Sequence, residues 1–415
     1  MRDTAGSALD GIRVCDLSGQ LAGAGATRTL AAFGAEVIRV EDPVRKGRWD
    51  LLRGIHPFVD SRRGIELGGA FNNHNVDKLG VTINTRTDRG RALLADLIQA
   101  SDVVTENFSA GVLESWGLGY RQLRELKPDI IYVSNCGFGH TGPYASYKTW
   151  GPIVQAVCGL TFSSGLPGQP LAGLGYSYMD HHGANLMTFA VLAALYHRGR
   201  TGEGQWIDMS CVEAGAALLG PAVLDWSVNS RPSRRDDKPD GNHNRSPLMV
   251  PHGIYPAAGD DEWVALACRT DADWIALAAE IGERWADEPA WSTVAGRLEG
   301  EPTLDERVAG WTGSQGKFDV QRRLLAAGVP CRAVQKPPER IDQDSATADW
   351  GLWPAVEHAE IGTVQVDGLP VHLSATDWRM ERGAPLLGEH NGYVLGKILG
   401  LSAEQISQLE ADDVI

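Results

Sequence analysis

The feature that most constrains the fold is an alternation of short apolar segments with helical segments over the first third of the chain. Five segments read as strands: 11–16 (GIRVCD), 36–41 (EVIRVE), 79–83, 102–105 and 130–134. Helices are expected to end near Phe33 and to span 86–100 and 120–127, between the strands. Strands that alternate with helices favour a mainly parallel sheet with helices on both faces. The sequence therefore predicts an α/β, Rossmann-like domain.

The first strand–helix–strand unit carries a small-residue loop, Leu17–Ala26 (LSGQLAGAGA). Such a loop is typical of a dinucleotide site, but the full pattern needs a third glycine where this chain has Arg28. The loop therefore disfavours a nicotinamide cofactor. A Rossmann-like half with another use of the loop is the better interpretation.

The stretch Tyr176–Glu213 is expected to be the chemical centre. Its one early acid, Asp180, precedes a nearly all-apolar run, Ala184–Tyr196, that suits a helix buried on most sides. Asp180 would then sit just before the first helical turn, where free N–H groups stabilise negative charge. It is either an N-cap or a carboxylate nucleophile held ionised by the helix end, and its position alone leaves both readings open.

Composition excludes several classes of function. The net charge of −15 argues against nucleic acid and anionic membranes as partners. No segment has the length of a membrane span, and no signal region opens the chain. The six cysteines are scattered without a C-x-x-C pair, which indicates reduced thiols and a cytoplasmic protein. A metal site at Asp180, His181 and His182 is disfavoured because adjacent side chains diverge.

The remaining chain predicts a second, smaller domain. A helix is expected over 212–228, and a polar segment, 229–247, reads as a linker or a loop over a site. A hairpin over 254–267, helices to about 328 and a strand at 329–334 follow. The domains expected are 1–228 (large, N-terminal part), 229–330 (linker and small domain) and 331–415 (return to the large domain). The basic segment 42–70 is either a solvated loop or a phosphate contact.

Seven stretches spread along the chain carry a family resemblance: GIRVCDLSGQLAG, FGAEVIRVE, NVDKLGVTIN, ENFSAGVLESWGLGY, SNCGFGHTGPY, ALYHRGRTGEGQWIDMS and PLLGEHNGYVLGKILGLS. With them the chain resembles the type III CoA transferases, which include formyl-CoA transferase, carnitine CoA-transferase and alpha-methylacyl-CoA racemase. The resemblance implies a Rossmann-like large domain with a parallel sheet built from both chain ends, a smaller α+β domain and a homodimer of two interlocked ring-like chains. It implies coenzyme A and acyl-CoA as substrates, with no permanently bound cofactor and no metal.

The resemblance also implies roles for individual residues. Asp180 matches the family's catalytic aspartate, which would form a mixed anhydride and then an aspartyl-CoA thioester while CoA passes from an acyl-CoA donor, such as succinyl-CoA, to a carboxylic acid. The positions that match CoA contacts are Gln20, Leu21, Ala22, Lys78, Asn107 and Phe108.

The chain departs from the family pattern at Ala24, Asp42, Cys136 and Gly241–Arg245. These departures argue against oxalate or formate as the substrate.

An alternative within the resemblance is racemisation of 2-methylacyl-CoA, which needs two acid/base groups at the alpha carbon. The racemases place a histidine and an aspartate where this chain has Trp150 and Gly151, and His181 or His182 would have to substitute. A bulky or aromatic acid is expected to fill an acyl pocket lined by aromatic side chains: Trp49, Tyr144, Trp150, Tyr176 and Tyr178.

Overall fold

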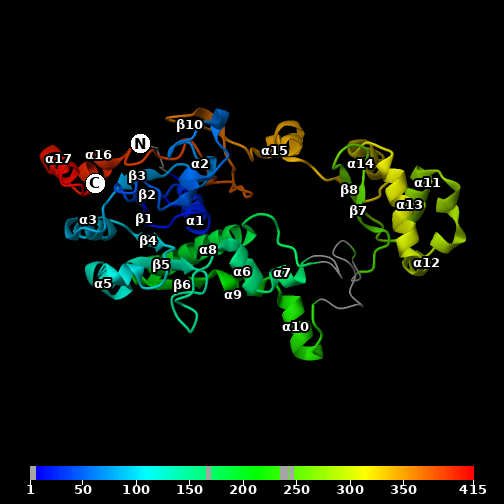
Figure 1. Ribbon diagram of the computed structural model, residues 1–415, viewed down its shortest axis with the longest axis horizontal. Helices are drawn as coiled ribbons and strands as arrows, with labels where there is room; N and C mark the ends of the chain where they lie inside the picture. The colour runs from blue at the N-terminus through cyan, green and yellow to red at the C-terminus, as the bar shows by residue number, and fades with distance from the viewer. Residues whose placement is uncertain (1–5, 165–169, 234–242, 244–246) are drawn as a thin grey trace. The chain divides into compact units, whose positions relative to one another are not determined.

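The computed structural model describes residues 6–164, 170–233, 243 and 247–415. The chain forms two compact units, which Figure 1 shows with their helices and strands labelled. The large unit combines 1–161, 173–223 and 346–415, and the small unit combines 162–172 and 224–345. The small unit thus begins slightly before the expected 229 and ends after the expected 330.

A six-stranded parallel sheet organises the large unit, with strand order β3-β2-β1-β4-β5-β6. The strands are β1 (Arg13–Asp16), β2 (Glu36–Glu41), β3 (Leu79–Thr82), β4 (Val103–Glu106), β5 (Ile131–Cys136) and β6 (Trp206–Ser210), and every neighbouring pair is parallel. The predicted α/β class with a parallel sheet is confirmed. Its six strands all come from the N-terminal part of the unit, so the prediction of a sheet built from both chain ends is wrong.

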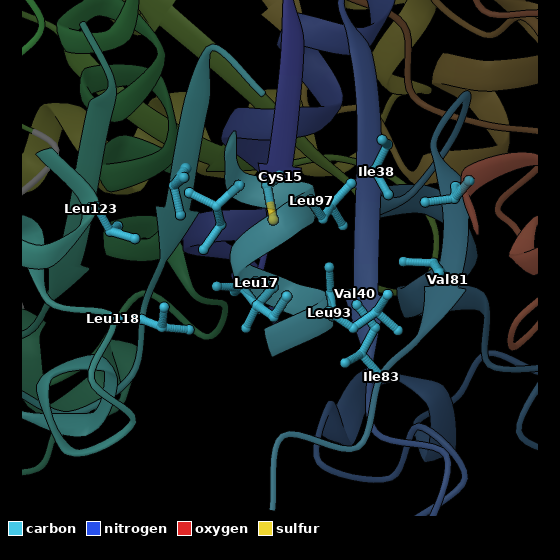
Figure 2. Packing of buried hydrophobic residues seen from close by; sticks show 14 of the residues in the cluster. Cys15, Leu17, Ile38, Val40, Val81, Ile83, Leu93, Leu97, Leu118 and Leu123 are labelled. Atoms are coloured by element: carbon cyan, nitrogen blue, oxygen red, sulfur yellow. The ribbon is translucent and has the colours of Figure 1, made fainter. Parts of the chain in front are cut away.

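Two apolar layers hold this sheet between helices. On one face, α1 (Ala22–Ala32) and α8 (Tyr178–Thr201) pack against alternate residues of the inner strands. On the other face lie α3 (Asp88–Gln99) and α5 (Tyr120–Leu126), and Figure 2 shows this cluster around Cys15 and Ile38. The C-terminal segment adds Val394, Leu395 and Leu409 to the same cluster, so the two chain ends share a core although they do not share a sheet.

The small unit is an α+β fold. Strands β7 (His252–Pro256), β8 (Trp263–Ala267) and β9 (Cys331–Ala333) form an antiparallel sheet, and the first two make the hairpin that the sequence predicts. Its helices include α11 (Asp271–Ile281), α12 (Val294–Glu299), α13 (Glu301–Gly313) and α14 (Lys317–Ala326). Because β9 pairs with β8, the segment at 331 belongs to this unit and not to the return into the large domain.

The remaining elements are short. They include α2 (Gly69–His74), α4 (Val112–Ser115), α6 (Gly151–Val157), α7 (Leu160–Ser163), α9 (Cys211–Ala217), α10 (Gly220–Asn229), α15 (Ser345–Trp350), α16 (Asn391–Tyr393), α17 (Ala403–Ala411) and an antiparallel hairpin of β10 (Ala355–His358) and β11 (Gly362–Gln365). α17 begins with a capping box, in which the Ser402 hydroxyl accepts from the Gln405 N–H and the Gln405 side chain accepts from the Ser402 N–H. The single helix expected over 212–228 is instead α9 and α10, bent by 69°.

A search of the described helices finds none that alone is long and apolar enough to cross a membrane; the bent pair α9 and α10 meets the length and composition criteria only when the two are taken together.

Helix α8 differs from its prediction in two ways. It begins at Tyr178 after the N-cap residue Ser177, so Asp180 lies inside the first turn and is not the N-cap. The helix is also buried on one side only, because Phe189 is 69% exposed and Tyr196 is 67% exposed. A helix that is apolar on both sides is expected to be buried on both sides. Its sequence does not show whether the second side is covered by the same chain.

Candidate active site

The loop after β1 is locked from two sides. The carboxamide of Asn107 accepts a hydrogen bond from the Gly19 N–H at 2.7 Å and donates to the Gly19 carbonyl oxygen at 2.8 Å. Gln20 adopts a left-handed backbone (φ 57°), and its N–H donates to the carboxylate of Asp50 at 3.1 Å. A left-handed non-glycine residue persists only where its surroundings hold it, and such residues cluster at functional sites.

A buried polar network supports this loop from below. The ammonium of Lys78, 1% exposed, donates to Asp16, Thr27, Asn75 and the carbonyl of Ala24, at 2.8–3.1 Å. Burial lowers the pKa of Lys78 to about 8, although Asp16 acts in the opposite direction.

The network bears on one predicted site residue. All three N–H donors of an ammonium group are used by these acceptors, and Lys78 is not part of the cavity lining described below. Its contact with coenzyme A therefore stays a prediction, for which this structure offers no free donor.

Asp180 lies against the start of α6. A Cβ placed on Gly151, the first residue of that helix, would come within 2.7 Å of Asp180 Oδ2. The carboxylate therefore occupies the space that any side chain at 151 would need. Burial raises the pKa of Asp180, while a hydrogen bond from Ser177 and the nearby His181 oppose that rise. Burial of the carboxylate therefore outweighs the stabilisation of its charge that the sequence analysis expects from the helix N-terminus.

These elements surround a cavity of about 270 Å³. Its lining is Gln20, Leu21, Ala22, Asn107, Phe108, Ser109, Asn135, Cys136, Gly137, Ala145, Tyr147, Lys148, Thr149, Trp150, Gly151, Val154, Asp180 and Cys211. The structure thus brings together Asp180, Trp150 and all the predicted CoA-contact residues except Lys78.

Four of the five aromatic residues predicted for the acyl pocket lie outside this lining, and only Trp150 is part of it. Trp49 contacts Phe108 with tilted rings whose centroids are 5.4 Å apart, and Tyr144 contacts Tyr147 at 5.2 Å, so both touch lining residues without being part of the lining. Tyr178, at the first turn of α8, and Tyr176 contact each other at 6.1 Å. The lining therefore weakens the expectation of a bulky or aromatic acid.

The sequence analysis missed several lining residues. Asn135 and Cys211 lie where β5 and β6 end, and Tyr147, Lys148 and Thr149 belong to the loop before α6. The signal that could have found the first two is their place at the carboxyl ends of parallel strands, the usual ligand edge of such a sheet. Lys148 is the only cation in the lining, and it has no ion-pair or hydrogen-bond partner among the described residues.

The lining favours a carboxylate over a thiolate as the nucleophile. Burial raises the pKa of Cys136 to about 11 and that of Cys211 to about 12, so both thiols stay protonated near neutral pH. A protonated thiol is a poor nucleophile. Asp180 is the only acid among the described residues that line this cavity.

The two competing chemistries gain no support from the lining. It contains no histidine, since His181 and His182 lie outside it, and Trp150 and Gly151 supply no proton-transfer group. Within the described residues, no three His, Cys, Asp or Glu side chains are grouped so that they could hold a metal ion.

Of the departures from the family pattern, Asp42 pairs with Arg86 at 3.0 Å and Ala24 is buried in α1. Of the segment 241–245, only His243 lies within the described residues. The basic segment 42–70 lines a separate cavity of about 770 Å³ with Arg48, Arg53 and Arg63 among its residues. Arg53 is neutralised there by Glu41 and Glu66.

Comparison with known proteins agrees with this site. The family model described as CoA-transferase family III matches residues 9–391. The chain is 32% identical to the succinyl-CoA–D-citramalate CoA-transferase of Chloroflexus aurantiacus, covering 98% of each chain. It is 34% identical to the succinate–glutarate CoA-transferase of Agrobacterium fabrum, covering 94% of this chain and 95% of that one.

A solved structure agrees as well. The crystal structure of a CaiB/BaiF family protein from Brucella suis superposes with a TM-score of 0.84 at 27% identity, covering 95% of this chain and all of that one. The chain therefore belongs to CoA-transferase family III, as an enzyme with CoA-transferase activity.

Proposed function

We propose that the enzyme moves CoA from an acyl-CoA donor to a carboxylic acid, with Asp180 as the covalent nucleophile. The observation that carries the proposal is the half-buried carboxylate of Asp180 at the wall of the cavity, beside the start of α6. Partial burial raises its pKa and hence its basicity. A more basic carboxylate is a stronger nucleophile toward a thioester carbonyl.

In the first half of the reaction, Asp180 becomes the CoA carrier. Its carboxylate oxygen attacks the donor's thioester carbon, the C–S bond breaks, and CoA leaves as a thiolate from a mixed anhydride. The thiolate then attacks Asp180 Cγ, the bond from Cγ to the anhydride oxygen breaks, and the donor acid leaves as a carboxylate. The product is an aspartyl-CoA thioester, which keeps the energy of the thioester on the enzyme.

The second half reverses these steps with the acceptor. The acceptor carboxylate attacks Asp180 Cγ and displaces the CoA thiolate, which gives a second mixed anhydride. The thiolate attacks the acceptor's acyl carbon, and the Asp180 carboxylate leaves. No net proton is taken up or released. Each attack passes through a tetrahedral oxyanion, for which nearby N–H donors provide stabilisation.

The β1–α1 loop is our candidate for the CoA cradle. Gln20, Leu21 and Ala22 offer backbone groups, Ala22 has a small side chain, and Asn107 and Phe108 line the same cavity. Lys148 is our candidate for a phosphate contact, because its charge is exposed and unpaired within the described chain. A point charge on a flexible stem suits a phosphate group.

Succinyl-CoA is our first candidate donor, because two relatives carry succinyl-CoA or succinate in their names. The small cavity favours a compact acceptor over a bulky or aromatic one. A screen of carboxylic acids against succinyl-CoA, read out as new acyl-CoA by liquid chromatography, tests both choices.

A trapping experiment tests the mechanism. Incubation with acyl-CoA and hydroxylamine should convert Asp180 to its hydroxamate, and borohydride should reduce the aspartyl thioester; peptide mass spectrometry locates either change. Asp180→Ala should fold with an unchanged melting temperature but transfer no CoA. Transfer by that variant, with no modification of the wild-type residue, would refute the nucleophile. An exchange assay at the alpha carbon separates transfer from racemisation.

We also propose that the enzyme is a homodimer, with the interlocked arrangement that its resemblance to the family implies. Support comes from exposed apolar side chains on one side of α8, Phe189, Leu192 and Tyr196. Contiguous exposed apolar surface on a soluble chain marks an interface. Light scattering should give twice the chain mass of 44.7 kDa. Phe189→Asp should lower that mass, and a monomeric wild-type protein would contradict the proposal.

A cytoplasmic location completes the proposal. All six cysteines are free thiols, and five of them are buried. Proteins that persist with unpaired cysteines are typical of a reducing compartment.

A further inference from the structure

The inner end of the Asp180 cavity is polar, although its surroundings are apolar. Asn135, on β5, is 1% exposed, and Cys211, the first residue of α9, is 5% exposed. The Cys211 thiol donates to Asn135 Oδ1 at 3.1 Å, and Asn135 Nδ2 donates to the sulfur of Met187 at 3.4 Å. By contrast, Tyr147 and Lys148 in the same lining are exposed and form its mouth.

These contacts leave the Asn135 amide under-used. A carboxamide has two N–H donors and an oxygen with two lone pairs. Here one N–H meets a thioether, which is a weak acceptor, and the oxygen meets a thiol, which is a weak donor. One N–H and one lone pair remain for a molecule in the cavity. A buried polar group without a good partner is costly, so a partner is expected in the substrate.

The position of Asn135 shows which part of a substrate it can meet. Alternate residues of β5 face opposite sides of the sheet, and Asn135 faces α8, where Met187 lies. Asp180 is two turns before Met187 on the same side of that helix, about 10 Å along its axis. CoA is large and anionic and must use the exposed mouth. The acyl group that reacts at Asp180 is therefore the part that extends toward Asn135.

The chemistry of the inner end selects a neutral polar group. Among the described lining residues Lys148 is the only cation, and it is exposed at the mouth, so none of them places a positive charge beside Asn135. A hydroxyl can accept from the free N–H and donate to the free lone pair at once. Burial keeps Cys211 as a neutral thiol with a pKa of about 12, so it adds no charge that would oppose a hydroxyl.

We propose that Asn135 is a specificity-determining residue that makes this enzyme prefer acids with a hydroxyl group on the acyl chain. The inference rests on the proposed CoA transfer through Asp180 and names the class of acid for that site. Asn135 acts on binding and on the transition state of the acyl transfer, and it takes part in no bond exchange.

The test uses matched acids that differ by one hydroxyl. With succinyl-CoA as donor, kcat/KM is measured for 3-hydroxybutyrate against butyrate, 2-hydroxybutyrate against butyrate, and citramalate against methylsuccinate. The wild-type enzyme should favour the hydroxy acid of at least one pair by about tenfold or more. Asn135→Leu, which keeps the volume and removes the amide, should bring that ratio close to one; the ratio is taken within the variant and so does not depend on the variant's overall rate.

Cys211→Ala is the matched control. It enlarges the same end of the cavity but leaves the Asn135 amide in place, so the preference for the hydroxy acid should persist. It also keeps the test decisive if Asn135→Leu does not fold, because a preference that disappears in Cys211→Ala reflects shape and overturns the inference.

Two results would overturn the inference alone: a wild-type enzyme that transfers CoA without preferring any hydroxy acid, or a preference that survives Asn135→Leu. A wild-type enzyme that transfers CoA to no acid and shows no Asp180 adduct would overturn the proposed function, and the inference with it.

Discussion

Gly151→Ala should slow CoA transfer without unfolding the enzyme. The new Cβ would lie 2.7 Å from Asp180 Oδ2 and 3.1 Å from its Cγ, whereas ordinary contact begins at 3.4 Å. The carboxylate must therefore retreat by about 0.7 Å, the difference between 3.4 and 2.7 Å. A misplacement of about 1 Å at a reacting group can cost 10²-fold in rate. We expect kcat to fall roughly 10- to 100-fold, which corresponds to about 1.4 to 2.7 kcal/mol in the barrier.

The assay follows the new acyl-CoA at saturating donor and acceptor, so that kcat and KM separate. The KM for acyl-CoA should change little, because the CoA cradle of Gln20–Ala22 lies on another loop. Gly199→Ala is the control: it lies near the other end of α8, and an added Cβ there meets nothing within 4 Å. A Gly151→Ala enzyme with kcat within twofold of the wild type would refute the claim that Asp180 needs this space.

Three further changes follow from the same structure. Lys78→Met should lower the free energy of unfolding by about 3–5 kcal/mol in urea titrations, because Asp16 is left buried and unpaired, whereas Lys148→Met should leave it unchanged. Lys148→Ala should instead raise the KM for acyl-CoA more than it lowers kcat. The difference in KM between this variant and the wild type should shrink with added salt. An unchanged KM would contradict the proposed phosphate contact. Burial raises the pKa of Glu106 from 4.5 to about 8, so its protonated form gives stability that is present below pH 4.5 and lost as the pH rises through 8. Glu106→Gln should remove this loss, so the free energy of unfolding of the variant minus that of the wild type should rise between pH 5 and 8.5. If both free energies change with pH in the same way, Glu106 is ionised throughout.

The sequence predicts the parts of the fold that depend on local pattern. Period and turn residues place β1, β2, β4, β5 and the β7–β8 hairpin, because strand alternation and glycine turns act over a few residues. Placement of the tail fails for a physical reason. Its apolar residues Val394 and Leu395 indicate burial, but only the packed core decides whether they join it as strand or helix.

The sequence predicts those residues of the candidate site whose side-chain chemistry alone suggests their role. Asp180, Asn107 and the Gln20–Ala22 loop meet in one cavity, as the family resemblance implies. The burial of Lys78 could not be predicted, because its sequence shows a cation but not the acceptors around it; those come from β1, from α1 and from the neighbouring Asn75. Gly151 could not have been found at all from pattern, since its importance lies in the space beside Asp180.

The locked loop after β1 has a consequence for mutational tolerance. Asn107, in the cavity lining, and Asp50, beneath the loop, fix the backbone of Gly19 and Gln20, and Arg39 holds Asp50 in place; Arg39 and Asp50 are fully buried. A saturation mutagenesis scan, in which cell growth depends on the enzyme's activity, should therefore show two layers of positions that do not tolerate substitution. One layer faces the cavity, and the second lies under it and never meets a substrate.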